Sequence, residues 1–196
     1  MNDGLAVIIP HLSFSVIIDL LDSIQVQENC DYHIFIVNNG NTGIEEKLRT
    51  YRLTSLFFNV NQGVSRSWNI GLNKAIEEGY RNFLWLNDDI ILRGSQVLKE
   101  SLDKILLGTV VTTQFEHIVG WAFGYNYDTF LKLGEFDERF YPCFYEDNDM
   151  DLRIKESQIP LGTIAGFDHK HSQTTCGTFQ NYKEAMRLIF EKKWPN

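Results

Sequence analysis

Cysteine and clustered positive charge are both scarce in this sequence. Its three cysteines, Cys30, Cys143 and Cys176, are widely spaced and form no Cys-x-x-Cys pair. Neither a disulfide framework nor a zinc knuckle is therefore indicated. The formal net charge is −8, and the longest basic cluster is Lys192–Lys193. This balance disfavours a protein that binds nucleic-acid phosphates or anionic membranes.

Long hydrophobic runs are missing as well. The run Leu5–Ile9 is far shorter than the roughly 18 residues that span a bilayer, and Met1–Gly4 carries no basic leader. We therefore expect a cytoplasmic protein. The 196 residues, 43% hydrophobic and 22% charged, have an ordinary globular composition without an internal repeat or linker. They predict a single domain over residues 1–196.

The first half of the chain alternates short apolar runs with amphipathic stretches. We expect strands at 5–9, 33–37, 56–58 and 83–86, and helices at 15–24, from about 44, and at 64–78. This order predicts a parallel α/β sheet whose ligands bind at the carboxyl ends of its strands. The polar loops Asn38–Gly43 and Asn87–Asp89 lie at those ends. In the second half we expect strands at 110–113, 120–125 and 161–167, and helices at 127–133, 144–156 and 179–193.

Two acidic segments are candidates for chemistry. Asp88 and Asp89 directly follow an apolar strand, where adjacent carboxylates suit Mg²⁺ or Mn²⁺, although a solvated acidic turn explains them equally well. The second segment, Glu146–Arg153, follows the aromatic stretch Phe140–Tyr145, which could raise a carboxyl pKa towards general-base chemistry. An acidic first turn that stabilises a helix is the alternative.

Histidines and aromatic residues complete the candidate set. His169 and His171 point to the same side of an extended segment and could join a carboxylate metal site, although surface histidines are common. Trp121 and Phe123 could contact a ligand through their aromatic faces or pack in the core. For Trp68 and Trp85 we expect packing.

The order of these motifs resembles the inverting nucleotide-sugar glycosyltransferases of family 2. Each fragment is weak alone, but together they cover nearly the whole chain. The segments that carry the resemblance are Val7–Pro10, Val37–Thr42, Asn61–Gly63, Trp68–Gly71, Leu86–Asp89, Gly120–Phe123, Leu133–Phe140, Phe144–Arg153, His169–Thr174 and Phe190–Trp194.

The resemblance implies an α/β single-domain GT-A fold, with a Rossmann-like, mostly parallel central sheet flanked by helices. Residues 1 to about 90 would bind the nucleotide-sugar, and residues from about 91 to 196 would form the acceptor and catalytic half. The implied reaction is a metal-dependent, inverting transfer of a sugar from a nucleoside-diphosphate donor to a hydroxyl of a glycan, lipid-linked or other acceptor. The implied cofactor is a divalent cation, Mn²⁺ or Mg²⁺.

The resemblance also implies roles for individual residues. Asp147 would be the general base, and Glu146 would orient it or bind the acceptor. Asp89 would hold the metal with His169, or with His171 as the alternative. Asn87 and Asn38 stand where the family commonly has aspartates, and an amide brings no charge. The implied donor-binding residues are Pro10, Asn38, Asn39, Asn61, Gly63, Asn69, Asn87 and Asp88, and the implied acceptor-binding residues are Trp121 and Phe123.

Asp149 and Asp151 are expected on the helix surface or as salt-bridge partners of Arg153. Two other functions remain open. The two asparagine replacements are compatible with a catalytically weak nucleotide-sugar binding module. A nucleotidyltransferase should carry a glycine-rich and basic phosphate loop after the first strand, and His11–Phe14 is not such a loop.

Overall fold

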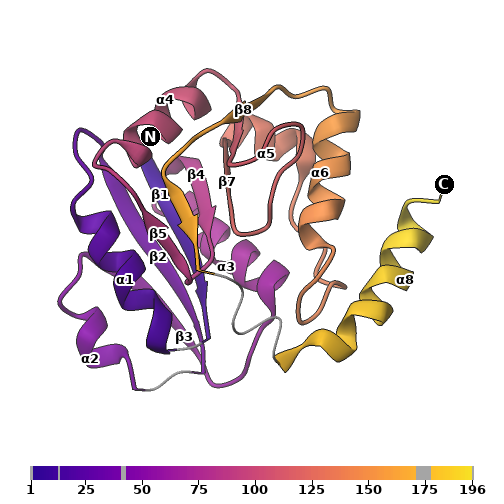
Figure 1. Cartoon of the computed structure of the whole chain (residues 1–196), viewed down its shortest axis with the longest axis horizontal. Coiled ribbons are helices and arrows are strands. Elements are labelled where there is room, and N and C mark those ends of the chain that lie inside the picture. The colour runs from indigo at the N-terminus through magenta and orange to yellow at the C-terminus, as the bar shows by residue number, and fades with distance from the viewer. Residues whose placement is uncertain (1, 13, 41–42, 171–177, 196) are drawn as a thin grey trace.

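The computed structural model describes residues 2–12, 14–40, 43–170 and 178–195. In this part of the chain a seven-stranded sheet has the order β3-β2-β1-β4-β7-β6-β8 (Figure 1). β1 to β4 are parallel, β7 runs antiparallel to both β4 and β6, and β8 is parallel to β6. The strands are β1 (Asn2–His11), β2 (Tyr32–Asn39), β3 (Leu53–Phe58), β4 (Tyr80–Leu86), β6 (Val110–Thr112), β7 (Ala122–Asn126) and β8 (Leu161–Thr163). The predicted α/β class and mostly parallel sheet are confirmed.

Helices cover both faces of the sheet. Side chains in β1 alternate between two cores, because successive strand residues point to opposite faces: Val7 joins one core and Ile8 the other. The first core includes residues of α1 (Phe14–Gln25) and α4 (Val97–Leu106), and the second includes residues of α3 (Val64–Glu77) and α6 (Glu146–Glu156). The shorter α2 (Glu45–Leu48) and α5 (Tyr127–Leu133) complete the set before the C-terminal segment. No helix among the described residues is long and apolar enough to cross a membrane.

A small second sheet lies beside the main one. β5 (Ile90–Leu92) pairs antiparallel with β9 (Phe167–His169), and Ile90 lies opposite His169 in the register. The sequence pattern had indicated neither β5 nor α4. The strand expected at 161–167 is wrong in extent, since it divides into β8 and β9. This division carries His169 away from β8 and beside the loop that follows β4.

The C-terminal segment leans against α6. A 3-10 turn, Gln180–Tyr182, precedes α8 (Lys183–Lys193), where one continuous helix from 179 was expected. Figure 1 shows α8, in yellow, on the side of α6 that faces away from the sheet. Most of its side chains are exposed or half-buried, while Met186 is buried. Polar contacts near its end, described below, therefore carry much of its attachment.

Candidate active site

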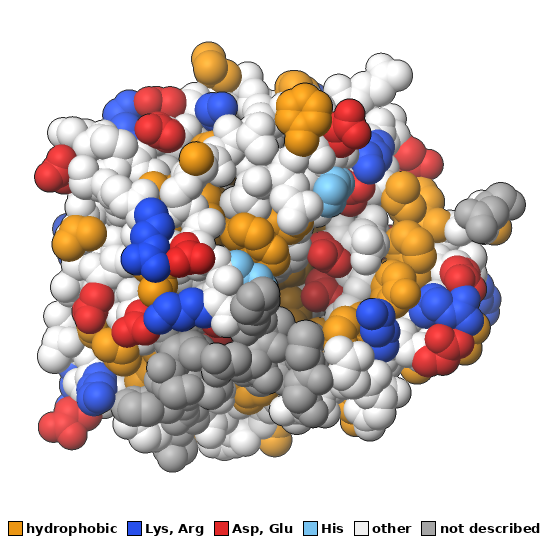
Figure 2. Space-filling model, viewed as in Figure 1, with side chains coloured by type: hydrophobic (Ala, Val, Ile, Leu, Met, Phe, Trp, Pro, Cys, Tyr) orange, Lys and Arg blue, Asp and Glu red, His pale blue; other side chains and the backbone are white. Residues whose placement is uncertain are grey.

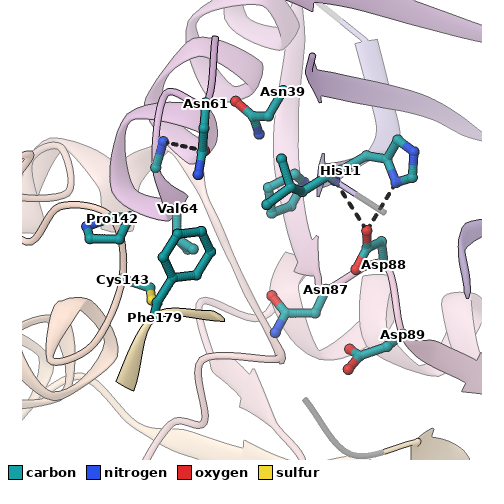
Figure 3. A pocket seen from close by; sticks show the side chains of 13 residues that line it. His11, Asn39, Asn61, Val64, Asn87, Asp88, Asp89, Pro142, Cys143 and Phe179 are labelled. Carbon is teal, nitrogen blue, oxygen red and sulfur yellow. Dashed lines mark hydrogen bonds and ion pairs between the residues drawn. The ribbon is translucent and has the colours of Figure 1, made fainter. Parts of the chain in front are cut away.

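Two adjoining pockets open at the carboxyl ends of the central strands. The first pocket encloses about 560 Å³ of empty space, including part of the open solvent, and Figure 3 shows its lining. Val64, Asn87 and Cys143 line both pockets and form a common wall. The first pocket is also lined by Pro10, His11, Leu12, Asn39, Asn61, Gly63, Asp88, Asp89, Pro142 and Phe179. The second is also lined by Gly120, Trp121, Phe144, Tyr145, Glu146, Asp147, Asn148, His169 and Lys183.

Asp88 is held by the end of β1. Its Oδ2 lies 2.9 Å from Nδ1 of His11 and accepts a 3.3 Å hydrogen bond from the backbone N–H of Leu12. Figure 3 shows the Asp88 side chain pointing towards His11, while Asp89 points elsewhere. His11 is fully buried, and its part in the site was missed from the sequence. The signal was its position: it ends β1, directly beside the loop after β4.

Asp89 faces His169. Its Oδ1 lies 3.3 Å from Nε2 of His169, because the β5–β9 pairing brings the two segments together. Asp89 is 7% exposed, and its Oδ1 has no hydrogen-bond partner in the part of the chain described. A carboxylate is a ligand that Mn²⁺ and Mg²⁺ prefer, and a facing neutral imidazole could complete the coordination of a metal ion. The described residues contain no group of three potential metal ligands, and His171 lies outside them.

Glu146 and Asp147 begin α6 and line the second pocket together. Glu146 is 8% exposed, and its Oε2 has no hydrogen-bond partner among the residues described. Burial raises the pKa of Glu146 well above its usual value, and the neighbouring charge of Asp147 adds to the shift. On the face shown in Figure 2, acidic side chains lie at the floor of a hollow beside α8.

Asp147 is fixed by backbone donors. Its Oδ2 accepts a 3.0 Å hydrogen bond from the N–H of Gly120, and its Oδ1 accepts one of 2.9 Å from the N–H of Asn148. Burial raises the pKa of Asp147, although these two hydrogen bonds act in the opposite direction. A Cβ atom at position 120 would lie 2.9 Å from Oδ2, so glycine leaves the space that the carboxylate needs. The result is an oriented carboxylate whose proton affinity is increased.

Comparison with known proteins identifies the family. The family model "Glycosyl transferase family 2" matches residues 6–174. The chain belongs to glycosyl transferase family 2. No curated protein sequence matches this family 2 chain significantly.

Solved glycosyltransferase structures share the fold. TarS 1-349 of S. aureus in complex with UDP-GlcNAc has 15% identity and a TM-score of 0.73, covering 95% of this chain and 65% of that one. The S. aureus TarS structure has 17% identity and a TM-score of 0.69, and the match covers 96% of this chain and 39% of the TarS chain. GalNAc-T7 with UDP, GalNAc and Mn²⁺ has 11% identity and a TM-score of 0.68, and the match covers 82% of this chain and 42% of the GalNAc-T7 chain. The family 2 chain thus has the GT-A fold and spans between 39% and 65% of the length of these TarS chains.

Six of the residues expected to bind the donor line the first pocket of this family 2 chain: Pro10, Asn39, Asn61, Gly63, Asn87 and Asp88. Two others lie elsewhere. Asn38 is fully buried and lines neither pocket. Asn69 donates to the carbonyl oxygen of Phe136 and to Glu138, and its Oδ1 accepts from the N–H of Phe136. Its amide is thus engaged in holding the loop after α5, which opposes direct contact with a donor.

The two aromatic residues expected to bind the acceptor lie in different environments. Phe123 is 1% exposed and packs against Trp68 and Trp85 in the core, with ring centroids 5.3 Å away in each case. Its burial opposes contact with a substrate. Trp121 is half-buried and lines the second pocket, where its ring stacks on His169. Residues two apart on one strand would share a face, but Trp121 precedes β7, which begins at Ala122, so its side chain is free of the alternation that places Phe123 in the second core.

Asp149 and Asp151, further along α6, are both buried, so the expectation that they lie on the helix surface is wrong. Asp149 is fully buried and binds Arg153, as one alternative predicted, with Nη2 to Oδ2 at 2.7 Å. Its Oδ1 lies 2.7 Å from Nζ of Lys193 and accepts a 2.8 Å bond from Nε1 of Trp194. Asp151 is 8% exposed and pairs with Lys155. Contacts made by α8 and by Ile118 cover these acids, which a helical wheel does not reveal.

Proposed function

We propose that this chain transfers a sugar from a nucleoside-diphosphate donor to an acceptor hydroxyl, with inversion at the anomeric carbon and with a divalent cation. The observation that carries this proposal is the pair of acidic centres in adjoining pockets. Asp89 lines the first pocket and faces His169, which lines the second together with Glu146 and Asp147. A transfer of this kind needs both a site for the diphosphate and a base for the hydroxyl.

Asp147 is the proposed general base. Its carboxylate is oriented by two backbone N–H groups, and its raised pKa makes it a better proton acceptor than an ordinary aspartate. Glu146 either hydrogen-bonds the acceptor or orients Asp147. An acceptor oxygen that attacks from the second pocket approaches the anomeric carbon opposite the diphosphate, so the configuration inverts. A positioned base of this kind contributes about 10²–10⁴ in rate.

Asp89 and His169 would hold the metal, with His171 as the alternative outside the described residues. Their fit to a cation rests on the buried Asp89 Oδ1, which lacks a hydrogen-bond partner in the described chain, and on the facing imidazole. When bound, the cation would supply Lewis-acid stabilisation of the negative charge on the leaving diphosphate. The neighbouring structure of GalNAc-T7 with Mn²⁺ supports a divalent cation in general.

The first pocket is the proposed donor site, and the second is the proposed acceptor site. Asp88, fixed by His11, presents a carboxylate to the first pocket that would accept a hydrogen bond from a ribose hydroxyl. UDP and UDP-GlcNAc in the TarS structures make uridine donors the first choice for testing. The acceptor is proposed to be a glycan, a lipid-linked sugar or another hydroxyl compound. Residues 1–90 would supply most of the donor site, and residues 91–196 most of the acceptor site.

Substitution of the base tests the proposal. We expect Asp147→Asn to lower sugar transfer by about 10²-fold or more while the dissociation constant for UDP with Mn²⁺ stays close to wild type, because the amide keeps the shape but takes no proton. Transfer is measured with a panel of nucleotide-sugars that begins with UDP-GlcNAc. Asp128→Asn, an exposed aspartate on α5, is the matched control.

Normal turnover in Asp147→Asn would refute the catalytic role. Donor binding without turnover of any sugar in the wild-type chain would instead support the nucleotide-sugar binding module. The two outcomes differ because the first requires an active wild type.

A further inference from the structure

We propose that Trp121 is a positioning residue for the metal site. Its indole ring stacks on the imidazole of His169 and holds that ring in the orientation in which Nε2 faces Asp89. We call this contact the clamp. This inference rests on the proposed function, because it assigns a role to a residue beside the proposed metal ligands. It replaces the expectation that Trp121 acts mainly by stacking on an acceptor sugar.

The stacking geometry is the first observation. The rings of Trp121 and His169 are 5.0 Å apart between centroids and 9° from parallel. One face of the indole is therefore covered by the imidazole. The final torsion of a histidine side chain is broad, so the ring could turn within its own site unless a neighbour restrained it. A parallel aromatic face supplies that restraint, and Nε2 is left 3.3 Å from Oδ1 of Asp89.

The strand that carries His169 is short. His169 ends β9, a strand of three residues whose partner β5 also has three, and both lie outside the main sheet. Its side chain is 20% exposed. Short strands fix the position of the Cα atom, but they do not fix the plane of the ring. Trp121, by contrast, packs against the first core.

Trp121 is also tied to the acidic loop itself. Its carbonyl oxygen accepts a 2.9 Å hydrogen bond from the backbone N–H of Asn87, two residues before Asp89. The residue thus links both halves of the proposed metal pair: its ring contacts His169, and its backbone holds the loop of Asp89. Contacts that orient a ligand in this way typically change metal affinity by about 10–100-fold when they are removed.

The test measures Mn²⁺ binding directly, by electron paramagnetic resonance of the free ion, with the whole chain in the presence and absence of UDP. We expect Trp121→Leu to weaken Mn²⁺ affinity about tenfold or more, and Trp121→Phe, which keeps an aromatic face, to stay within about threefold of wild type. UDP binding in EDTA should be equal in all three proteins. Phe115→Leu is the control, because Phe115 is 77% exposed in the same β6–β7 connection.

If folded Trp121→Leu binds Mn²⁺ as tightly as wild type, the clamp is refuted. If that variant also has a raised KM for the acceptor, stacking of Trp121 on an acceptor sugar is favoured instead. If the leucine variant does not fold, Trp121→Met, whose unbranched and flexible side chain fills irregular gaps without a ring plane, replaces it in the same measurement. His169→Ala separates this inference from the proposed function. If that variant binds Mn²⁺ as tightly as wild type, the metal assignment fails; if it loses Mn²⁺ while Trp121→Leu does not, only the clamp fails.

Discussion

Buried carboxylates in this chain fall into two kinds at the scale of single residues. Asp149 is fully buried and receives donors from Arg153, Lys193 and Trp194, so its charge is compensated. Glu146 is buried at the floor of the second pocket, and its Oε2 has no partner in the described chain. Backbone hydrogen bonds offset the effect of burial on Glu146 only in part, so the neutral form of its carboxyl group is favoured. The first kind supports the structure, and the second is available to a ligand.

Glu146 makes stability depend on pH in a defined direction. Because its pKa is raised in the folded protein, its contribution to stability is fully present below the unfolded pKa and is lost as pH rises through the folded pKa. Glu146→Gln removes this loss. We expect the melting temperature of the variant, relative to wild type, to be higher at pH 8 than at pH 4 by about 2–4 °C, for a difference on the order of 1 kcal/mol.

Thermal unfolding at several pH values checks this prediction, with the exposed Glu156→Gln as the control. A difference in melting temperature that stays constant from pH 4 to pH 8 would show that Glu146 has the same proton affinity in both states.

Gly120 gives a second prediction at this scale. An alanine Cβ would lie 2.9 Å from Oδ2 and 3.0 Å from Cγ of Asp147, so the carboxylate must move. Small displacements of a catalytic group are costly, and we expect Gly120→Ala to lower transfer by about tenfold or more with donor affinity unchanged. Steady-state kinetics and a UDP titration measure both quantities. Unaltered transfer would mean that the position of Asp147 is not critical.

At the scale of elements, α6 and α8 act as a pair. α6 carries Glu146 and Asp147 in its first turn, and Asp149 follows within the same turn. Lys193 and Trp194, at the end of α8, both contact Oδ1 of Asp149, and Phe190 packs on Tyr145 with ring centroids 5.3 Å apart. The helix that presents the proposed base is therefore attached to the C-terminal helix at two points.

We expect Asp149→Asn to destabilise the protein by about 3 kcal/mol, because it leaves the cation of Arg153 without its buried counter-charge and leaves Lys193 with Asp137 alone. This corresponds to a fall in melting temperature of about 6–12 °C. Asp103→Asn is the matched control, since Asp103 also pairs with a residue four positions away, Lys99, but is exposed. Its effect should stay below about 1 kcal/mol. Equal effects of the two substitutions would contradict the anchoring role of Asp149.

The sequence predicted regular elements better than the contacts between them. The parallel strands could be predicted because both of their faces are buried and their side chains read as continuous apolar runs. β5 and β9 could not, because three residues carry no periodicity and their pairing joins segments far apart in the chain. The role of His11 was missed for the same reason, and so were the contacts of Asn69, which was expected to bind the donor. Each is defined by a partner more than 60 positions away in sequence.

At the scale of the whole molecule, both pockets lie at the same end of the sheet, where the parallel central strands have their carboxyl ends. β7 runs antiparallel to β4, and Leu86 pairs with Ala122. The beginning of β7 therefore meets the end of β4, and Trp121 reaches the same rim as Asn87. The polar residues that follow β2 and β4 meet here as the sequence predicted, and Asn39 and Asn87 line the same pocket, because parallel strands end on one side. The reversal of β7 was not predicted, and it adds residues from the second half of the chain to that side.

Ligand-dependent stability tests the site in the intact chain. We expect UDP with Mn²⁺, each at about 100 times its dissociation constant, to stabilise the protein by about 2.7 kcal/mol per site and to raise the melting temperature by about 5–10 °C. EDTA should abolish the metal-dependent part of this shift. Asp89→Ala should abolish it too, because one of the two proposed ligands is lost. A full metal-dependent shift in Asp89→Ala would refute the assignment of Asp89.

The common wall of Val64, Asn87 and Cys143 is a boundary that both pockets share. A donor that displaces this wall by a fraction of an ångström changes the shape presented to the acceptor, and an acceptor does the same to the donor. Coupling of this kind is reciprocal: whatever factor the donor contributes to acceptor affinity, the acceptor must return to donor affinity. If the wall moves in this way, a single partition would let occupation of one pocket change the affinity of the other before any bond is broken.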